Sequence, residues 1–233
     1  MRKLEQRFSV VLILVLCLTL LMSSFVLAKN DTECQTFSMV ANDDQLKILN
    51  DLYGKDISYG ELVEKVYPAA LERTPANVLK NMYKAKFEWP DVNSQSSSKT
   101  SNSSKRVNEN FMIDEEADDM TPRIDVGVGN ESNISIGENK IDYDSGSRVW
   151  LPYPTYTIPH MSVTSILVRD GYGAVASQYK SDSNCYGISA SGTHYFPSEG
   201  RYQTQGFHYG EFPVGANPPN YMVSTNSRWV DYE

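Results

Sequence analysis

Alternating hydrophobic and polar positions dominate the chain from about residue 124 onward. Val126 and Val128, and then Ile134 and Ile136, alternate with polar residues or glycine. Runs rich in β-forming residues follow, with turn residues between them, at 163–168, 174–179, 186–196 and 201–212. A period of two is typical of half-buried strands, and no helix-length apolar pattern interrupts these runs. The pattern therefore predicts a mainly β protein with a C-terminal antiparallel β-sandwich over residues 123–233.

Hydrophobic residues between 42 and 89 instead recur every three or four positions, which predicts three short helices. Asp43 or Asp44 is expected to cap the first helix. Ser58 and Glu61 form a capping-box pattern, and Thr74 is expected to cap a third helix. This small α-helical unit, residues 29–90, has too little apolar surface for a comfortable core of its own. We therefore expect it to pack against another part of the protein.

Residues 91–122 show neither periodicity. Ser94 to Ser104 consists almost entirely of Ser, Asn, Lys and Gln, and an acidic run spans 114–119. Such a segment cannot bury enough apolar surface to offset its chain entropy. The composition predicts a disordered linker between the helical unit and the sandwich, with the acidic run as a solvated tether.

The first 28 residues have the three parts of a secretory signal peptide. Arg2, Lys3 and Arg7 precede an apolar run over 8–22, and Val26 and Ala28 stand at the −3 and −1 positions of a cleavage site. The alternative is an uncleaved membrane anchor, but the apolar run is shorter than the ~20 residues that a membrane span needs. We predict cleavage after Ala28 and a secreted or extracytoplasmic cell-surface location.

The formal net charge is −8. Cleavage after Ala28 removes three basic residues and one acidic residue, which leaves a formal charge of −10. Nucleic acids and anionic membrane surfaces bind clustered positive charge, so the acidic balance disfavours both as partners. Beyond the signal peptide, no stretch of the chain is apolar and long enough to span a membrane.

Two cysteines remain after cleavage, Cys34 and Cys185. In an oxidising compartment two thiols suggest one disulfide, and the alternative is two thiols that do not pair with each other. Four sequons also fit an exported glycoprotein, although such matches arise by chance in Asn- and Ser-rich segments. The candidate glycosylation sites are Asn30, Asn102, Asn130 and Asn133.

The sequence contains no catalytic motif, no metal-ligand spacing and no cofactor-binding loop, so we predict no catalytic residue, no metal and no cofactor. Its three histidines are His160, His194 and His208. The last two are expected to face each other across a hairpin that turns at 197–200. Structural or surface roles are more common for such histidines than metal binding. Cys185 with His194 would form a nucleophile pair, but no third residue is evident to orient the base.

Aromatic density is the compositional feature that points to a function. Residues 150–233 hold 15 Phe, Trp and Tyr but only four Lys or Arg. Most of these rings are expected to pack the core, as β-sheets favour them. The Pro-rich surroundings of four of them predict exposed rings that bind a sugar or a protein. These are Trp150, Tyr153, Tyr156 and Tyr221.

We predict a non-enzymatic binding or envelope-interaction module whose partner is an envelope glycan or a surface protein. The alternative is a secreted hydrolase with its site on the C-terminal β domain. That alternative requires the three histidines to converge with a carboxylate in one cleft, whereas a binding module requires exposed aromatic rings without such a cluster.

Overall fold

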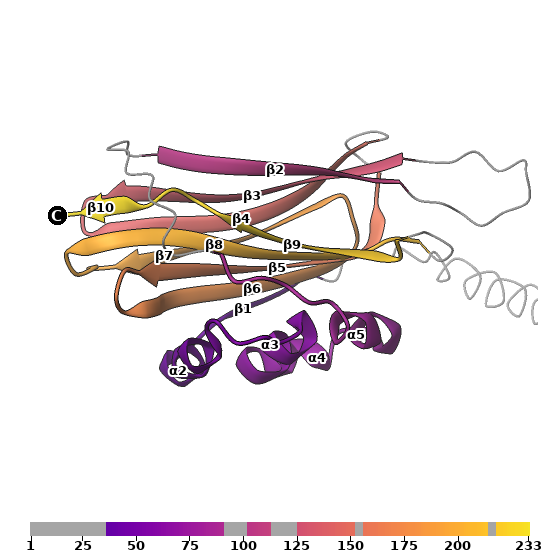
Figure 1. The fold of residues 1–233 in the computed structure, drawn as a ribbon, viewed down its shortest axis with the longest axis horizontal. Helices are drawn as coiled ribbons and strands as arrows, with labels where there is room; N and C mark the ends of the chain where they lie inside the picture. Colours follow the sequence, from indigo (N-terminus) through magenta and orange to yellow (C-terminus); the bar gives the residue numbers. More distant parts are fainter. Residues whose placement is uncertain (1–35, 91–101, 113–124, 152–155, 214–217) are drawn as a thin grey trace, which may run out of the picture. The chain divides into compact units, whose positions relative to one another are not determined.

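The computed structural model describes residues 36–90, 102–112, 125–151, 156–213 and 218–233. A layer of short helices lies on one face of a first antiparallel sheet, and a second antiparallel sheet lies on the other face (Figure 1). The mainly β fold with an antiparallel sandwich is thus confirmed. The predicted signal peptide, Asn30 and Cys34 lie outside the described residues.

The first sheet has the strand order β1-β6-β5-β8-β10, and β9 also pairs with β8. Its strands are β1 (Phe37–Val40), β5 (Ile158–Arg169), β6 (Gly173–Cys185), β8 (Gly200–Glu211), β9 (Asn220–Asn226) and β10 (Val230–Tyr232). Strands β5 and β8 are buried along nearly their whole length. Both faces of these central strands are covered, which explains why polar residues alternate less regularly there.

The second sheet has the order β2-β3-β4-β7. Its strands are β2 (Asn102–Met112), β3 (Asp125–Gly137), β4 (Lys140–Leu151) and β7 (Gly187–Tyr195). In β4 the odd-numbered residues from 141 to 149 are buried and the even-numbered ones are partly or fully exposed. This sheet therefore covers the sandwich core with one face and presents the other to solvent, as its alternation predicts.

The helices are α2 (Asp43–Leu52), α3 (Tyr59–Val66), α4 (Pro68–Leu71) and α5 (Ala76–Met82). The capping box of Ser58 and Glu61 is confirmed. The first cap is Asn42, which exchanges hydrogen bonds with Gln45, so the aspartates occupy the first turn instead. Thr74 does not cap α5, because its hydroxyl donates to the Ala70 carbonyl oxygen (2.8 Å).

The helical layer shares one hydrophobic core with the first sheet. Leu49, Leu62 and Met82 are fully buried in the same cluster as Ile166 and Phe207. Tyrosine rings stack across the boundary, Tyr59 on Tyr209 at 5.6 Å and Tyr67 on Tyr179 at 5.3 Å. The expectation that the helical unit packs against another part is confirmed, and residues 34–233 form one compact unit.

Two segments depart from the predicted domain boundaries. Residues 102–112 lie inside the predicted disordered linker, but they form strand β2, which pairs with β3 along its whole length. Residues 37–40 precede the helices and form β1 at the edge of the first sheet, paired with β6. The linker prediction is therefore wrong for 102–112. Backbone hydrogen bonds hold a strand whatever its polarity, so composition alone misses such a strand.

The expected hairpin between β7 and β8 is also wrong. Strand β7 pairs with β4 in the second sheet, whereas β8 lies between β5 and β9 in the first. Residues 196–199 therefore cross from one sheet to the other. The crossing separates His194 from His208, which the hairpin would have brought together.

The interior between the two sheets has a polar middle. One hydrophobic cluster includes Val128, Val149 and Val163, and another includes Ile141 and Leu167. Along each strand, buried polar residues lie between the two clusters and hydrogen-bond across the sheets. This polar layer consists of Asn130, Ser132, Ser145, Ser147, Ser165, His208 and Thr225.

Candidate functional site

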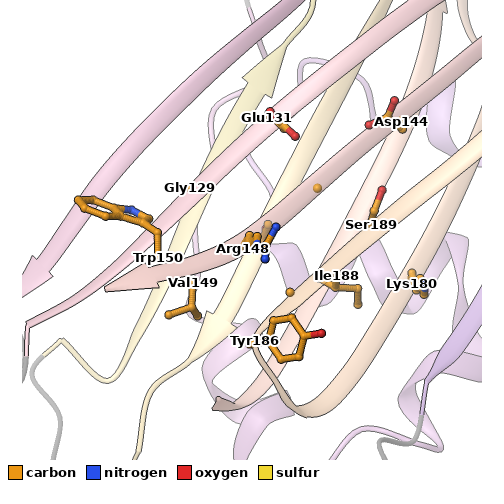
Figure 2. Close-up of a pocket in the computed structure, with 13 residues that line it drawn as sticks. Gly129, Glu131, Asp144, Arg148, Val149, Trp150, Lys180, Tyr186, Ile188 and Ser189 are labelled. Carbon is orange, nitrogen blue, oxygen red and sulfur yellow. The ribbon is translucent and has the colours of Figure 1, made fainter. Parts of the chain in front are cut away.

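A groove of about 960 Å³ crosses the solvent-facing side of the second sheet (Figure 2). Strand alternation places Asp144, Arg148 and Trp150 of β4 on this side. Strand β3 adds Gly129 and Glu131, and the β6–β7 region adds Lys180, Tyr186, Gly187 and Ser189.

Three glycines on neighbouring strands hollow out the groove. Gly129 of β3 and Gly187 of β7 both pair with Arg148 of β4, and Gly146 pairs with Glu131 and Ser189. A Cβ at Gly187 would lie 3.4 Å from the Arg148 Cγ, and one at Gly146 would lie 3.6 Å from the Ser189 Cβ. Side chains at Gly146 and Gly187 would therefore occupy part of the groove, and their absence leaves the backbone open to a ligand.

Two exposed aromatic rings flank the cationic group. Trp150 is 40% exposed and Tyr186 is 48% exposed, and Figure 2 shows them on either side of Arg148. The Val149 N–H donates to the Tyr186 carbonyl oxygen (2.8 Å), which fixes Tyr186 beside the end of β4. The Trp150 indole lies over Gly127, where an added Cβ would come within 2.6 Å of its Cε2 atom. Gly127 thus sets the height of the indole above the sheet.

Two carboxylate side chains also line the groove, Glu131 of β3 and Asp144 of β4. Asp144 accepts a hydrogen bond from the Asn133 Nδ2 (3.0 Å), and burial, together with the charge of Glu131, raises the pKa of Asp144 above its usual value. Among the described residues, no ion pair uses the Arg148 guanidinium. The groove therefore offers hydrogen-bond donors, acceptors and flat apolar faces, which suits a polar ligand with ring faces.

The four predicted binding residues differ in position and burial. Trp150 lies in the groove, and Tyr153 lies outside the described residues. Tyr156 is partly buried against the hydrophobic cluster between the sheets. Tyr221 is only 2% exposed, so the prediction of an exposed ring is wrong there. Although it follows two prolines, Tyr221 belongs to β9, and its position in the alternation points it into the sandwich.

Several parts of the groove were not predicted from the sequence. They are Arg148, Tyr186 and the glycine floor, which consists of Gly129, Gly146 and Gly187. The alternation over 140–151 carries a usable signal, since it places Asp144, Arg148 and Trp150 on one face of one strand. Tyr186 follows β6 and reaches the groove only because β7 pairs with β4. That pairing is not readable from local patterns.

The three histidines lie apart. His208 is fully buried in the polar layer, and His160 is 3% exposed, with its ring 6.5 Å from that of Tyr209. His194 lies near Tyr202, with the two rings 6.5 Å apart. Tyr202 pairs with Arg169 at one end of β5, and His160 lies nine residues away along the same strand, or about 30 Å. The described residues thus lack the convergence that the hydrolase alternative requires. They also contain no group of three His, Cys, Asp or Glu side chains placed to hold a metal ion.

The predicted modifications also have specific outcomes. Asn130 is fully buried, and its Oδ1 accepts a hydrogen bond from Ser147 (2.8 Å), so this fold excludes a glycan there. Asn133 is partly exposed on the outer face, and Asn102 is the first residue of β2. Cys185 is buried, with its Sγ 3.8 Å from the Asp182 carbonyl oxygen. Its disulfide with Cys34 stays a prediction, because Cys34 lies outside the described residues.

Comparison of the chain with models of known protein families, with curated proteins and with solved structures finds no match. No helix within the described part of the chain is long and apolar enough to cross a membrane.

Proposed function

We propose that this protein is an exported, non-enzymatic binding module whose outer-face groove holds a glycan at the cell surface or outside the cell. The observation that carries the proposal is the placement of Trp150 and Tyr186 on either side of Arg148, above a glycine floor. Aromatic faces stack on the apolar C–H faces of sugar rings, while charged and hydroxyl side chains bond the sugar hydroxyls. The secretory signal predicted for residues 1–28 supports the extracytoplasmic location.

In this proposal each part of the groove has a role. The Trp150 indole stacks on one sugar ring, and Tyr186 borders the next position. Arg148 donates to ring or hydroxyl oxygens, and Asp144 and Glu131 accept from sugar hydroxyls farther along β3 and β4. The glycines allow the sugar to approach the backbone. Nucleic acid is disfavoured as the ligand, because the chain is acidic and the groove itself mixes both charges.

Replacing the indole tests the groove directly. Trp150→Ala should weaken binding to a glycan by about 1–3 kcal/mol, or at least roughly fivefold in Kd, because it removes the stacking face. The measurement is retention of the chain from Lys29 onward, which contains the whole compact unit, on cellulose, chitin and peptidoglycan. Tyr172→Ser is the matched control, since Tyr172 is also an exposed ring but lies outside the groove. Retention of wild type on none of these polysaccharides, or equal loss in both variants, would contradict the proposal.

A second variant moves the indole without removing it. Gly127→Ala places a methyl group where the Trp150 ring now lies, and the half-exposed ring can shift outward without unfolding the sheet. We expect a loss of glycan binding of a few-fold, smaller than that of Trp150→Ala. The double variant should then lose no more than Trp150→Ala alone, because the methyl group acts only through the ring. Additive losses in the double variant would mean that Gly127 affects binding by another route.

A further inference from the structure

Three highly exposed aromatic residues lie at one end of the sandwich, away from the groove. Tyr172 is 68% exposed, Tyr195 is 66% exposed and Phe196 is 81% exposed, the highest values among the large hydrophobic residues that the structure describes. They come from the β5–β6 turn and from the end of β7 with its crossing to β8. We call these three residues the aromatic tip.

Contacts between the turns hold the aromatic tip together. The Phe196 N–H donates to the Asn139 carbonyl oxygen in the β3–β4 turn (2.9 Å), and Tyr195 pairs with Lys140. The Arg169 Nη2 donates to the Glu199 carbonyl oxygen (2.6 Å), and its guanidinium lies 3.9 Å from the centre of the Tyr172 ring. The β5–β6 turn and the β7–β8 crossing are therefore fixed to each other through Arg169.

The backbone at Phe196 is strained in a way that keeps its ring outside. Its φ is 51°, in the left-handed region that residues other than glycine, asparagine and aspartate rarely adopt. The hydrogen bond to Asn139 maintains this conformation, and the side chain remains 81% exposed. Strain of this kind persists only where the surrounding structure imposes it, and it concentrates at sites of function.

We propose that the aromatic tip inserts into the interface of a zwitterionic lipid bilayer. Tyr172 and Phe196 lie in connections between strands and Tyr195 ends β7, so these exposed rings can enter between lipid headgroups, whereas a rigid protein partner would need a matching cavity. Tyrosine suits this depth because its hydroxyl stays hydrated while its ring is buried, and phenylalanine reaches deeper. This inference is independent of the glycan groove.

The charges around the tip favour a bilayer without net charge. Arg201 lies 3.7 Å from Asp170 and 3.8 Å from Asp231, so two carboxylates oppose its one positive charge. The exposed Glu138 and Glu199 in the neighbouring turns add negative charge, so this end of the sandwich has no net positive charge to attract anionic lipid. Lys140 is likewise paired with Asp142 at 2.7 Å. Binding should therefore come from the apolar area of the rings and depend little on salt, unlike the attraction of a polybasic surface to anionic lipid.

The test uses phosphatidylcholine vesicles and the chain from Lys29 onward, so that the apolar run over 8–22 is absent. Wild type should sediment with the vesicles. The triple variant Tyr172→Ser, Tyr195→Thr, Phe196→Asn should bind at least about tenfold more weakly, since each ring contributes buried apolar area. Asparagine tolerates the left-handed backbone, which keeps the crossing intact without the ring. An unchanged urea midpoint confirms that the variant is folded.

Trp150→Ala is the matched control, since it removes an exposed ring from the groove and should leave vesicle binding unchanged. Failure of wild type to bind, or equal binding of the triple variant, would overturn the inference. If the triple variant instead abolishes self-association seen by light scattering without vesicles, the tip contacts a second copy of the chain and the bilayer assignment is wrong. None of these outcomes bears on the glycan groove, whose own test contains no lipid.

Discussion

Leu49→Ala is expected to destabilise the sheets as much as the helix that carries it. Leu49 is fully buried in the core that α2 shares with the first sheet, so the change removes apolar contacts and leaves a cavity at that boundary. Such truncations cost about 2–5 kcal/mol, a large part of the stability of an ordinary domain. Because the core is shared, hydrogen exchange of the β5 and β8 amides should speed up together with that of α2.

Ile48→Ala is the neighbouring control. Ile48 stands on the same helix but is 38% exposed, so its truncation should cost less than about 1 kcal/mol. If Leu49→Ala accelerated exchange only in the helices and left β5 and β8 protected, the helical layer would be a separate folding unit. That result would support the predicted division into a helical unit and a sandwich.

The strands and caps that sequence could predict are those whose signals are local. The alternation of hydrophobic residues places Val126, Val128 and Ile134 on the buried face of the second sheet, as the structure does. The Ser58–Glu61 capping box begins α3 as expected. Strand β1 was missed because four residues are too few to show a period. Its partner, at residues 178–181 of β6, lies about 140 residues away in the chain. Alternation indicates which face of a strand is buried but not which strand pairs with it.

The same limit explains which parts of the candidate site could be predicted from the sequence. Trp150 was predicted as an exposed ring from its Pro-rich surroundings, and its side chain is 40% exposed. The prediction of an exposed ring was wrong for Tyr221, because the two prolines before it suggest a loop. Strand β9 begins at Asn220, so Tyr221 lies in a strand instead. Tyr186 and the glycines contribute to the groove only through the pairing of β3, β4 and β7. A site built across three strands is a property of the register, which local patterns do not contain.

The polar layer between the sheets encloses His208 completely. An amide oxygen only accepts, so Ser147 uses its proton in the bond to the Asn130 Oδ1 (2.8 Å). The His208 Nδ1 lies 2.9 Å from the Ser147 Oγ, and its Nε2 lies 2.7 Å from the Thr225 Oγ1. Burial disfavours the charged ring and lowers the pKa of His208 to about 3.

Stability should consequently fall as the pH drops below about 6.5. In that range the unfolded chain takes up protons on His208 while the folded protein does not, so the free energy of unfolding decreases by about 1.4 kcal/mol per pH unit. For His208 the loss ends near pH 3 and reaches roughly 5 kcal/mol. Burial also lowers the pKa of His160, to about 4, which adds roughly 3 kcal/mol between pH 6.5 and 4. Burial raises the pKa of Glu211, which pairs with His160 across β5 and β8, and the proton that the folded protein then binds there offsets part of the loss at acidic pH.

His160→Phe is expected to separate the two histidines. Among the described residues, neither ring nitrogen of His160 has a hydrogen-bond partner, so phenylalanine removes a titrating group without breaking a bond. The variant should be more stable than wild type at pH 7 by on the order of 1 kcal/mol, because it no longer buries two unsatisfied nitrogens. Its loss of stability between pH 6.5 and 5 should be about half that of wild type, since His208 still titrates.

Urea unfolding at pH 7, 6 and 5 measures both effects. His194→Phe is the control, because His194 is only partly buried and lies far from the polar layer, so its replacement should change the slope less. A wild-type stability that stays constant from pH 7 to 5 would show that the folded protein binds protons as readily as the unfolded chain. His208 would then have to be protonated inside the sandwich, and its lowered pKa would be contradicted.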